Sequence, residues 1–265
     1  MKKGKEVPIE IPLEFRVACT LLNLEISGVL QSFIDHVSVY CFLGGGPLDG
    51  YSEATSFITD LNLEQLPTEN GNGKSAEMGA INTAFSLPAL KVLRQLVALG
   101  TSNVGSEQQR HQRSIALVEK LYGYRKDYQS SPDRLFLEDG ACLVFGKDFR
   151  IICELYAVDG LSYLQYFMSC ISLAEFRAQV ALKRQFESMP QLFVFDYISR
   201  NRDEQSKIIP LTEAIDLYIT ELQKLNARHF IVRDLKKRTE CYREFFLSHY
   251  YNILKEKGDH YGNTN

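Results

Sequence analysis

The chain has 265 residues, of which 45% are hydrophobic and 24% charged, a balance typical of a globular protein with a sizeable core. Its net charge of −3 does not favour nucleic-acid binding over the whole surface, although it leaves room for a local basic patch. No apolar run reaches the roughly 18 residues of a membrane span, and no apolar signal segment follows the basic N-terminus. We therefore expect a cytoplasmic protein.

In chain order, alternating residues over 7–12 predict a short strand. Apolar residues at helical spacing then predict a helix over 14–22 and, after a break, a second helix over 29–37. Stretches rich in Gly, Pro and polar residues predict loops at 44–47 and 67–75. The other helices predicted in the first half are 51–60, 87–99 and 106–128.

The stretch 14–42 recurs at 148–176 without a gap, so that every position of the first copy has its counterpart at one constant offset. Nine of the 29 aligned pairs are identical, against roughly two expected by chance. The identical pairs are Phe15/Phe149, Arg16/Arg150, Cys19/Cys153, Leu21/Leu155, Leu30/Leu164, Gln31/Gln165, Phe33/Phe167, Ser38/Ser172 and Phe42/Phe176. The second copy also follows a predicted strand, at 141–145. Further helices are predicted at 175–187, 191–200, 211–225 and 233–257, with a disordered tail from Gly258.

This repetition predicts a mainly α fold made by internal tandem duplication. Each half would be a short strand and a helix-turn-helix unit with a helical extension. The polar stretch 130–133 suggests two modules, 1–130 and 131–265, packed with pseudo-two-fold symmetry.

A strand followed by two short helices resembles the ribbon-helix-helix module, and also the opening of uncharacterised bacterial proteins. The match covers 7–42 and 141–176. The resemblance implies that the two strands pair antiparallel within the chain and that the paired ribbon reads base edges in the DNA major groove. The outward residues, however, lack the side chains that contact bases: Pro8, Glu10 and Pro12, and Cys142, Val144 and Gly146.

Signatures of chemistry are weak. The segment Gly71–Ser75 resembles the end of a phosphate-binding loop, but Thr68 stands where the first glycine is required. The five histidines lack metal-ligand spacing, and the six cysteines form no C-x-x-C pair. We therefore expect no catalytic residue, metal or cofactor, and we interpret Cys19 and Cys153 as packed thiols.

Two sets of polar residues remain as candidates. Arg16 and Arg150 recur near two helix N-termini and could bind anions, but capping or cross-helix hydrogen bonds, as for the recurring Gln31 and Gln165, are favoured. A basic cluster begins the last helix and could contact nucleic acid or phosphate, although a solvated helix face is favoured. Its members are Arg233, Lys236, Lys237 and Arg238, with Arg228 and Arg243 nearby.

These features lead to three functional hypotheses. The first is a non-enzymatic helical scaffold or protein-interaction protein with an unknown protein partner and no membrane association. The alternative is a DNA-binding transcriptional regulator that uses the ribbon-helix-helix-like modules and the basic cluster. The third, an enzyme of unrecognised type, rests on no residue in particular.

Overall fold

The computed structural model describes residues 9–46, 48, 50–59, 87–124, 134–138, 140–156, 158–184, 188–201 and 212–262, without the side chains of 58–59, 212–218 and 257–262. Within these ranges the protein has twelve helices and one two-stranded sheet, so the prediction of a mainly helical fold is confirmed. The predicted loop at 67–75 and the predicted boundary at 130–133 lie outside the described residues.

The first half consists of six described helices that follow a single β-bridge at Ile9. They are α1 (Leu13–Leu21), α2 (Ile26–His36), α3 (Val39–Phe42), α4 (Tyr51–Thr59), α6 (Leu87–Gly100) and α7 (Glu107–Gly123). All but α3 were predicted. The four-residue α3 is too short to show a hydrophobic period, and its start is marked only by Ser38, whose hydroxyl accepts a hydrogen bond from the Cys41 N–H.

The second half has a β-hairpin and then six described helices. They are β1 (Arg134–Phe136), β2 (Cys142–Val144), α8 (Lys147–Leu155), α9 (Gly160–Ser169), α10 (Leu173–Ala181), α11 (Met189–Arg200), α13 (Thr212–Arg228) and α14 (Leu235–Gly262). The predicted end of α10 at Glu187 was wrong, because Lys183 adopts a left-handed backbone with a φ of 54°. The helix α14 continues to Gly262, past the predicted start of the disordered tail at Gly258.

The two segments that resemble each other in sequence also have matching backbones. The helices α8, α9 and α10 follow α1, α2 and α3 at the same offset that separates the two stretches of sequence. The Leu24 N–H donates to the Cys19 carbonyl at 2.7 Å, and at the equivalent positions of the second segment the Val158 N–H donates to the Cys153 carbonyl at 2.9 Å. Matching local hydrogen bonds therefore join the same positions in both segments.

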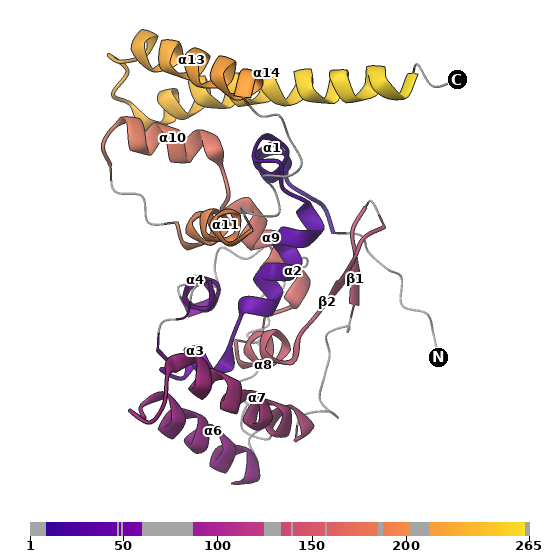
Figure 1. The fold of residues 1–265 in the computed structure, drawn as a ribbon, viewed down its shortest axis with the longest axis vertical. Helices are drawn as coiled ribbons and strands as arrows, with labels where there is room; N and C mark the ends of the chain where they lie inside the picture. Colours follow the sequence, from indigo (N-terminus) through magenta and orange to yellow (C-terminus); the bar gives the residue numbers. More distant parts are fainter. Residues whose placement is uncertain are drawn as a thin grey trace, which may run out of the picture.

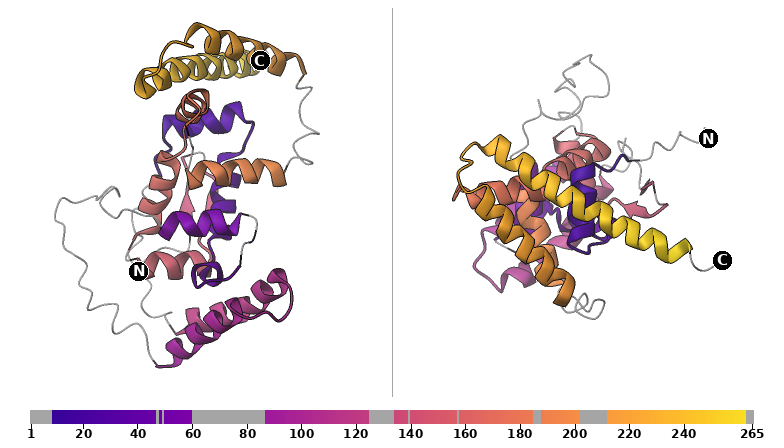
Figure 2. Two further views of the ribbon diagram at one scale, coloured as in Figure 1. Left: turned by 90° about the vertical axis from the view of Figure 1, so that its left-hand side faces the viewer. Right: turned by 90° about the horizontal axis from the view of Figure 1, so that it is seen from above.

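One hydrophobic core serves both halves. It contains apolar side chains from both sides of the predicted module boundary, and the ring of Phe33 in α2 stacks on that of Phe167 in α9 with centroids 3.9 Å apart. The α6–α7 hairpin packs at one end of the long axis and the α13–α14 hairpin at the other (Figures 1 and 2). Each hairpin also contacts the opposite half, since α7 contacts α8 and α14 contacts α1.

The strands do not form the ribbon that the resemblance implies. In the described residues β2 pairs antiparallel with β1, so that Leu143 lies opposite Leu135. Ile9 makes an isolated parallel bridge with Leu137 instead of pairing with β2. Pairing with β1 provides the backbone hydrogen-bond partners of β2 through a short local connection. Closing this short loop costs less chain entropy than pairing β2 with a segment from the distant N-terminal part of the chain.

No helix in the described part of the chain is by itself long and apolar enough to cross a membrane. Among the described helices, only the consecutive pair α1 and α2 together has the length and apolar composition of a membrane span, and the two helices are bent by 102° with respect to each other. Both contribute fully buried side chains, such as Phe15 and Phe33, to the core.

The stacked rings yield the first prediction. Phe33→Ala and Phe167→Ala each remove a ring that is 0% exposed, so each should lower the free energy of unfolding by about 3–5 kcal/mol. The double variant should lose less than the sum of the two, because each ring loses the other as partner. Urea denaturation measures both effects, with Phe230→Ala, at a ring that is 64% exposed, as control. Losses no larger than that of the control would contradict a joint core.

Candidate functional site

The recurring glutamines connect the two halves. Gln31 in α2 donates from Nε2 to the Val144 carbonyl at 3.0 Å and accepts from the Val144 N–H at 2.8 Å. Gln165 in α9 donates from Nε2 to the Glu10 carbonyl at 2.7 Å. Glu10 and Val144 are themselves equivalent positions, separated by the offset of the repeat. Each glutamine therefore binds the extended backbone before the first helix of the opposite half, as in a two-fold exchange.

An acidic pair makes a second reciprocal contact. Asp148 at the start of α8 accepts a hydrogen bond from the Val39 N–H in the first turn of α3, at 2.8 Å. Its counterpart Glu14 accepts from the Ser172 hydroxyl, which caps α10, at 3.0 Å. Burial raises the pKa of Asp148 to about 6, although the bond from Val39 opposes that shift. Each carboxylate therefore accepts a hydrogen bond from the start of a helix in the opposite half.

The recurring arginines each bind groups within the chain. Arg16 pairs with the Glu138 carboxylate and donates from Nε to the Ile11 carbonyl at 3.1 Å. Arg150 is buried, donates from Nη1 to the Tyr122 hydroxyl at 2.6 Å, and lies over the Tyr122 ring. Each has its own partners, which supports the structural interpretation of these residues.

The two recurring cysteines are also packed inside the protein. All six are free thiols, and Cys19 and Cys153 are buried, as predicted. Burial raises the pKa of Cys19 to about 12 and the pKa of Cys153 further still. Neither thiol is therefore a nucleophile at neutral pH.

The basic cluster at the start of α14 divides into two parts. Arg233, Lys236 and Lys237 are exposed to solvent. Arg238 is only 2% exposed, and it donates to the His229 carbonyl at 3.0 Å and the Ala181 carbonyl at 3.4 Å. Arg238 therefore holds the turn before α14 against the end of α10 and is no candidate for a nucleic-acid contact.

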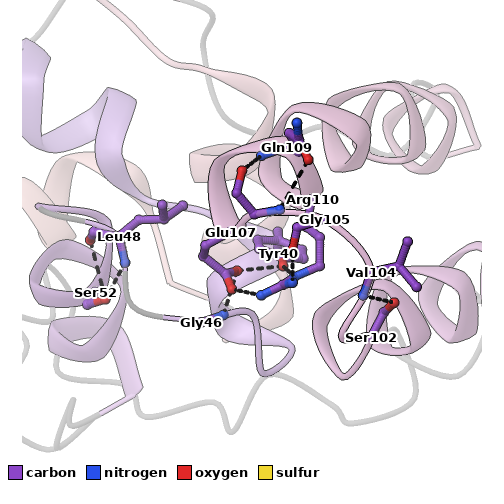
Figure 3. Close-up of polar contacts among 11 residues, drawn as sticks. Tyr40, Gly46, Leu48, Ser52, Ser102, Val104, Gly105, Glu107, Gln109 and Arg110 are labelled. Carbon is purple, nitrogen blue, oxygen red and sulfur yellow. Dashed lines mark hydrogen bonds and ion pairs between the residues drawn. The ribbon is translucent and has the colours of Figure 1, made fainter.

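A polar cluster that the sequence did not point to lies where the α6–α7 hairpin meets α3 (Figure 3). Glu107, the first residue of α7, accepts from the Tyr40 hydroxyl at 2.6 Å and from the Gly46 N–H at 2.8 Å, and pairs with Arg110. Arg110 also donates to the Gly105 carbonyl at 2.7 Å. A side chain on Gly46 would displace the Glu107 carboxylate from its present position beside the Gly46 backbone.

The electrostatics of the cluster follow from these bonds. Burial alone would raise the pKa of Glu107, but the hydrogen bonds from Tyr40, Arg110 and Gly46 outweigh it and lower that pKa. Burial, and then the bond to Glu107, raise the pKa of Tyr40. The available signals in the sequence were the glycines at 44–46 and the capping box that Ser106 forms with Gln109. Neither shows which residues meet in space.

A surface hollow of about 560 Å³ lies beside this cluster. It is lined by Leu48, Tyr51, Ser106, Glu107, Gln108, His111 and Gln112. Burial lowers the pKa of His111, and the Tyr51 ring lies 4.6 Å from it. Glu107 already accepts bonds from three donors, and Ser106 caps α7, so neither is available as a base or a nucleophile. We assign no chemistry to the hollow.

The described residues contain no group of three or more His, Cys, Asp and Glu side chains that could hold a metal ion. The segment Gly71–Ser75, which resembles part of a phosphate-binding loop, lies outside the described residues. Comparison with known proteins does not add a function: no family model, no curated protein and no solved structure matches the chain.

The second prediction concerns Asp148. Its folded pKa of about 6 lies above the usual 3.8, so the folded state binds the proton more tightly and wild-type stability should fall as the pH rises from about 4 to about 6. Asp148→Asn keeps an acceptor oxygen for Val39 but cannot ionise. Relative to wild type, it should therefore gain stability over that interval, by at most about 3 kcal/mol, which corresponds to a pKa raised from 3.8 to about 6.

Urea denaturation at pH 4, 5, 6 and 7 measures this difference, with Glu244→Gln on the exposed face of α14 as the control. A stability difference between D148N and wild type that does not change with pH would contradict the raised pKa.

The third prediction concerns Glu107→Gln, which keeps an acceptor for Tyr40 but loses the charge that pairs with Arg110. We expect the free energy of unfolding to fall by about 1–2 kcal/mol. Hydrogen exchange should accelerate mainly at 105–111, because this is where the hairpin is attached. Because the pKa of Glu107 is lowered, wild type should lose the same stabilisation as the pH falls through that pKa. Unchanged exchange at 105–111 would show that the cluster does not hold the hairpin.

Proposed function

We propose that this chain is a non-enzymatic interaction protein, built as an intrachain pair of duplicated halves that present two different helical hairpins. The pairing is supported by the common offset of the helix starts and by the reciprocal contacts of Gln31 with Val144 and of Gln165 with Glu10. The polar residues that recur are thus used to join the halves. They do not converge on a site for a small molecule.

The role as an interaction protein is supported by the distribution of the exposed apolar side chains. Among the described residues, five large apolar side chains are more than half exposed, and all lie on the two hairpins. They are Leu87, Val104, Phe230, Ile231 and Tyr251. Exposed apolar side chains that gather on one part of a surface are typical of interaction sites.

The α6–α7 hairpin is the part that fits a protein partner. Leu87, Leu90 and Val97 follow one face of α6 and are 76%, 41% and 41% exposed, while the opposite face packs inward through Val92 and Leu96. The exposed cations Lys91 and Arg94 lie on the same outer side. This face would suit an amphipathic helix that combines apolar and acidic residues.

DNA binding through a ribbon is less well supported. In the described residues the outward positions are occupied by Glu10, Cys142 and Val144, and Gln31 already binds the backbone of Val144. A carboxylate would also repel the phosphates.

The fourth prediction tests the α6 face. Leu90→Gln with Val97→Gln should leave the thermal midpoint unchanged and reduce recovery of bound protein about tenfold, which corresponds to about 1.4 kcal/mol of binding free energy. The measurement is quantitative affinity purification after cross-linking in cells that express the gene. The control pair is Leu13→Gln with Val144→Gln, at side chains that are 47% and 49% exposed on the central body. Equal recovery with both pairs would remove the α6 face as the interaction site.

A further inference from the structure

The turn between α13 and α14 carries two adjacent exposed apolar side chains. Phe230 is 64% exposed and Ile231 is 87% exposed, the highest value among the large apolar side chains described. The turn lies at the end of the hairpin opposite the C-terminus (Figure 1). Two adjacent apolar residues at such a position are costly in water unless another surface covers them.

Cations surround this pair. From Lys224 to Lys237 the sequence contains five Lys and Arg residues and one acidic residue, although the whole chain has a net charge of −3. All five cations are exposed, and none pairs with a carboxylate in the described part of the protein. The one acid, Asp234, accepts a hydrogen bond from the Lys237 N–H at the start of α14. The tip is therefore strongly positive while the rest of the chain is net negative.

The tip is also held in place. The buried Arg238 donates to the carbonyl of His229, the residue before Phe230, and to that of Ala181 at the end of α10. The Val232 N–H closes the turn on the His229 carbonyl at 3.0 Å. The Arg233 guanidinium lies over the Phe230 ring at 5.3 Å. Phe230 and Ile231 are thus presented outward on a fixed turn, so docking costs little additional ordering.

We propose that the α13–α14 turn docks on membrane surfaces rich in anionic lipid. Phe230 and Ile231 enter the boundary between head groups and acyl chains, and Lys224, Arg228 and the three exposed cations of α14 and its approach contact the head groups. The outermost side chain, that of Ile231, favours lipid over single-stranded nucleic acid, because isoleucine has no π face on which a base could stack. The net negative remainder of the protein is repelled by the same surface, which orients the tip toward it. This is attachment to a surface, not a membrane span.

Vesicle flotation with the full chain tests the proposal. The vesicles are pure phosphatidylcholine, or phosphatidylcholine with about 30% phosphatidylserine, in low and high salt. We expect binding to the anionic vesicles to be about tenfold stronger, and to weaken in high salt. Phe230→Ser with Ile231→Ser, and separately Lys236→Gln with Lys237→Gln, should each reduce it about fivefold or more without changing the thermal midpoint. The control, Arg94→Gln with Lys91→Gln, removes the same amount of charge from α6 and should not reduce binding to the anionic vesicles.

The absence of tryptophan from the sequence permits a second readout. Ile231→Trp places a single tryptophan at the tip, and Val104→Trp places one on the other hairpin. Emission of I231W should shift to the blue with anionic vesicles, and that of V104W should not.

Several results would overturn the proposal: no preference for anionic vesicles, equal binding by the Phe230/Ile231 variant, or no shift for I231W. Tighter binding of a mixed-sequence DNA, lost in the same variants, would also overturn it and assign the tip to nucleic acid. Since L90Q/V97Q alters only the α6 face, vesicle binding by that variant separates this proposal from the protein-partner proposal.

Discussion

The packing of Phe33 against Phe167 joins the two halves of this protein, and aromatic rings of α4 and α11 pack on the same pair. These rings belong to the central helices of the two matching segments, and both are fully buried. Neither α2 nor α9 could bury its apolar face within its own segment, because each segment is only three short helices with an extended approach. Pairing supplies the missing surface. Around the rings, Gln31, Gln165, Glu14 and Asp148 fix the register by polar bonds that cross from one half to the other.

The turn of each hairpin is held by an arginine of the second helix of that hairpin. Arg110 and Arg238 are both the fourth residue of the second helix of a hairpin, and both donate to a carbonyl in the turn that precedes that helix, Gly105 and His229. Their surroundings differ. Arg110 is neutralised by Glu107, whereas Arg238 donates to carbonyls and pairs with no carboxylate in the described part of the chain. The same device therefore leaves one turn electrically balanced and the other strongly positive.

The sequence was informative where the signal is local. Hydrophobic periodicity predicted most helices to within a few residues, because the buried face of a helix gives its own chain segment a regular spacing of apolar residues. The constant offset predicted which helices would match. Hydrophobic periodicity does not show how segments distant in sequence are placed relative to each other. It therefore could not predict that Gln31 binds residue 144, or that Glu107 binds Tyr40 and Gly46. The strand pairing was mistaken for a related reason: no pattern in the residues before β2 distinguished a local hairpin from a ribbon between halves.

The contrast between the centre and the hairpins suggests where a function can reside. The ring of Phe33 packs on the ring of Phe167, the equivalent residue of the other segment, so a change at either position alters the packing of both. The hairpins are free of that constraint. The helix α7 has 17 residues and α14 has 28, and their turns differ in charge and in exposed apolar side chains. The proposed partner and lipid surfaces both lie on these hairpins.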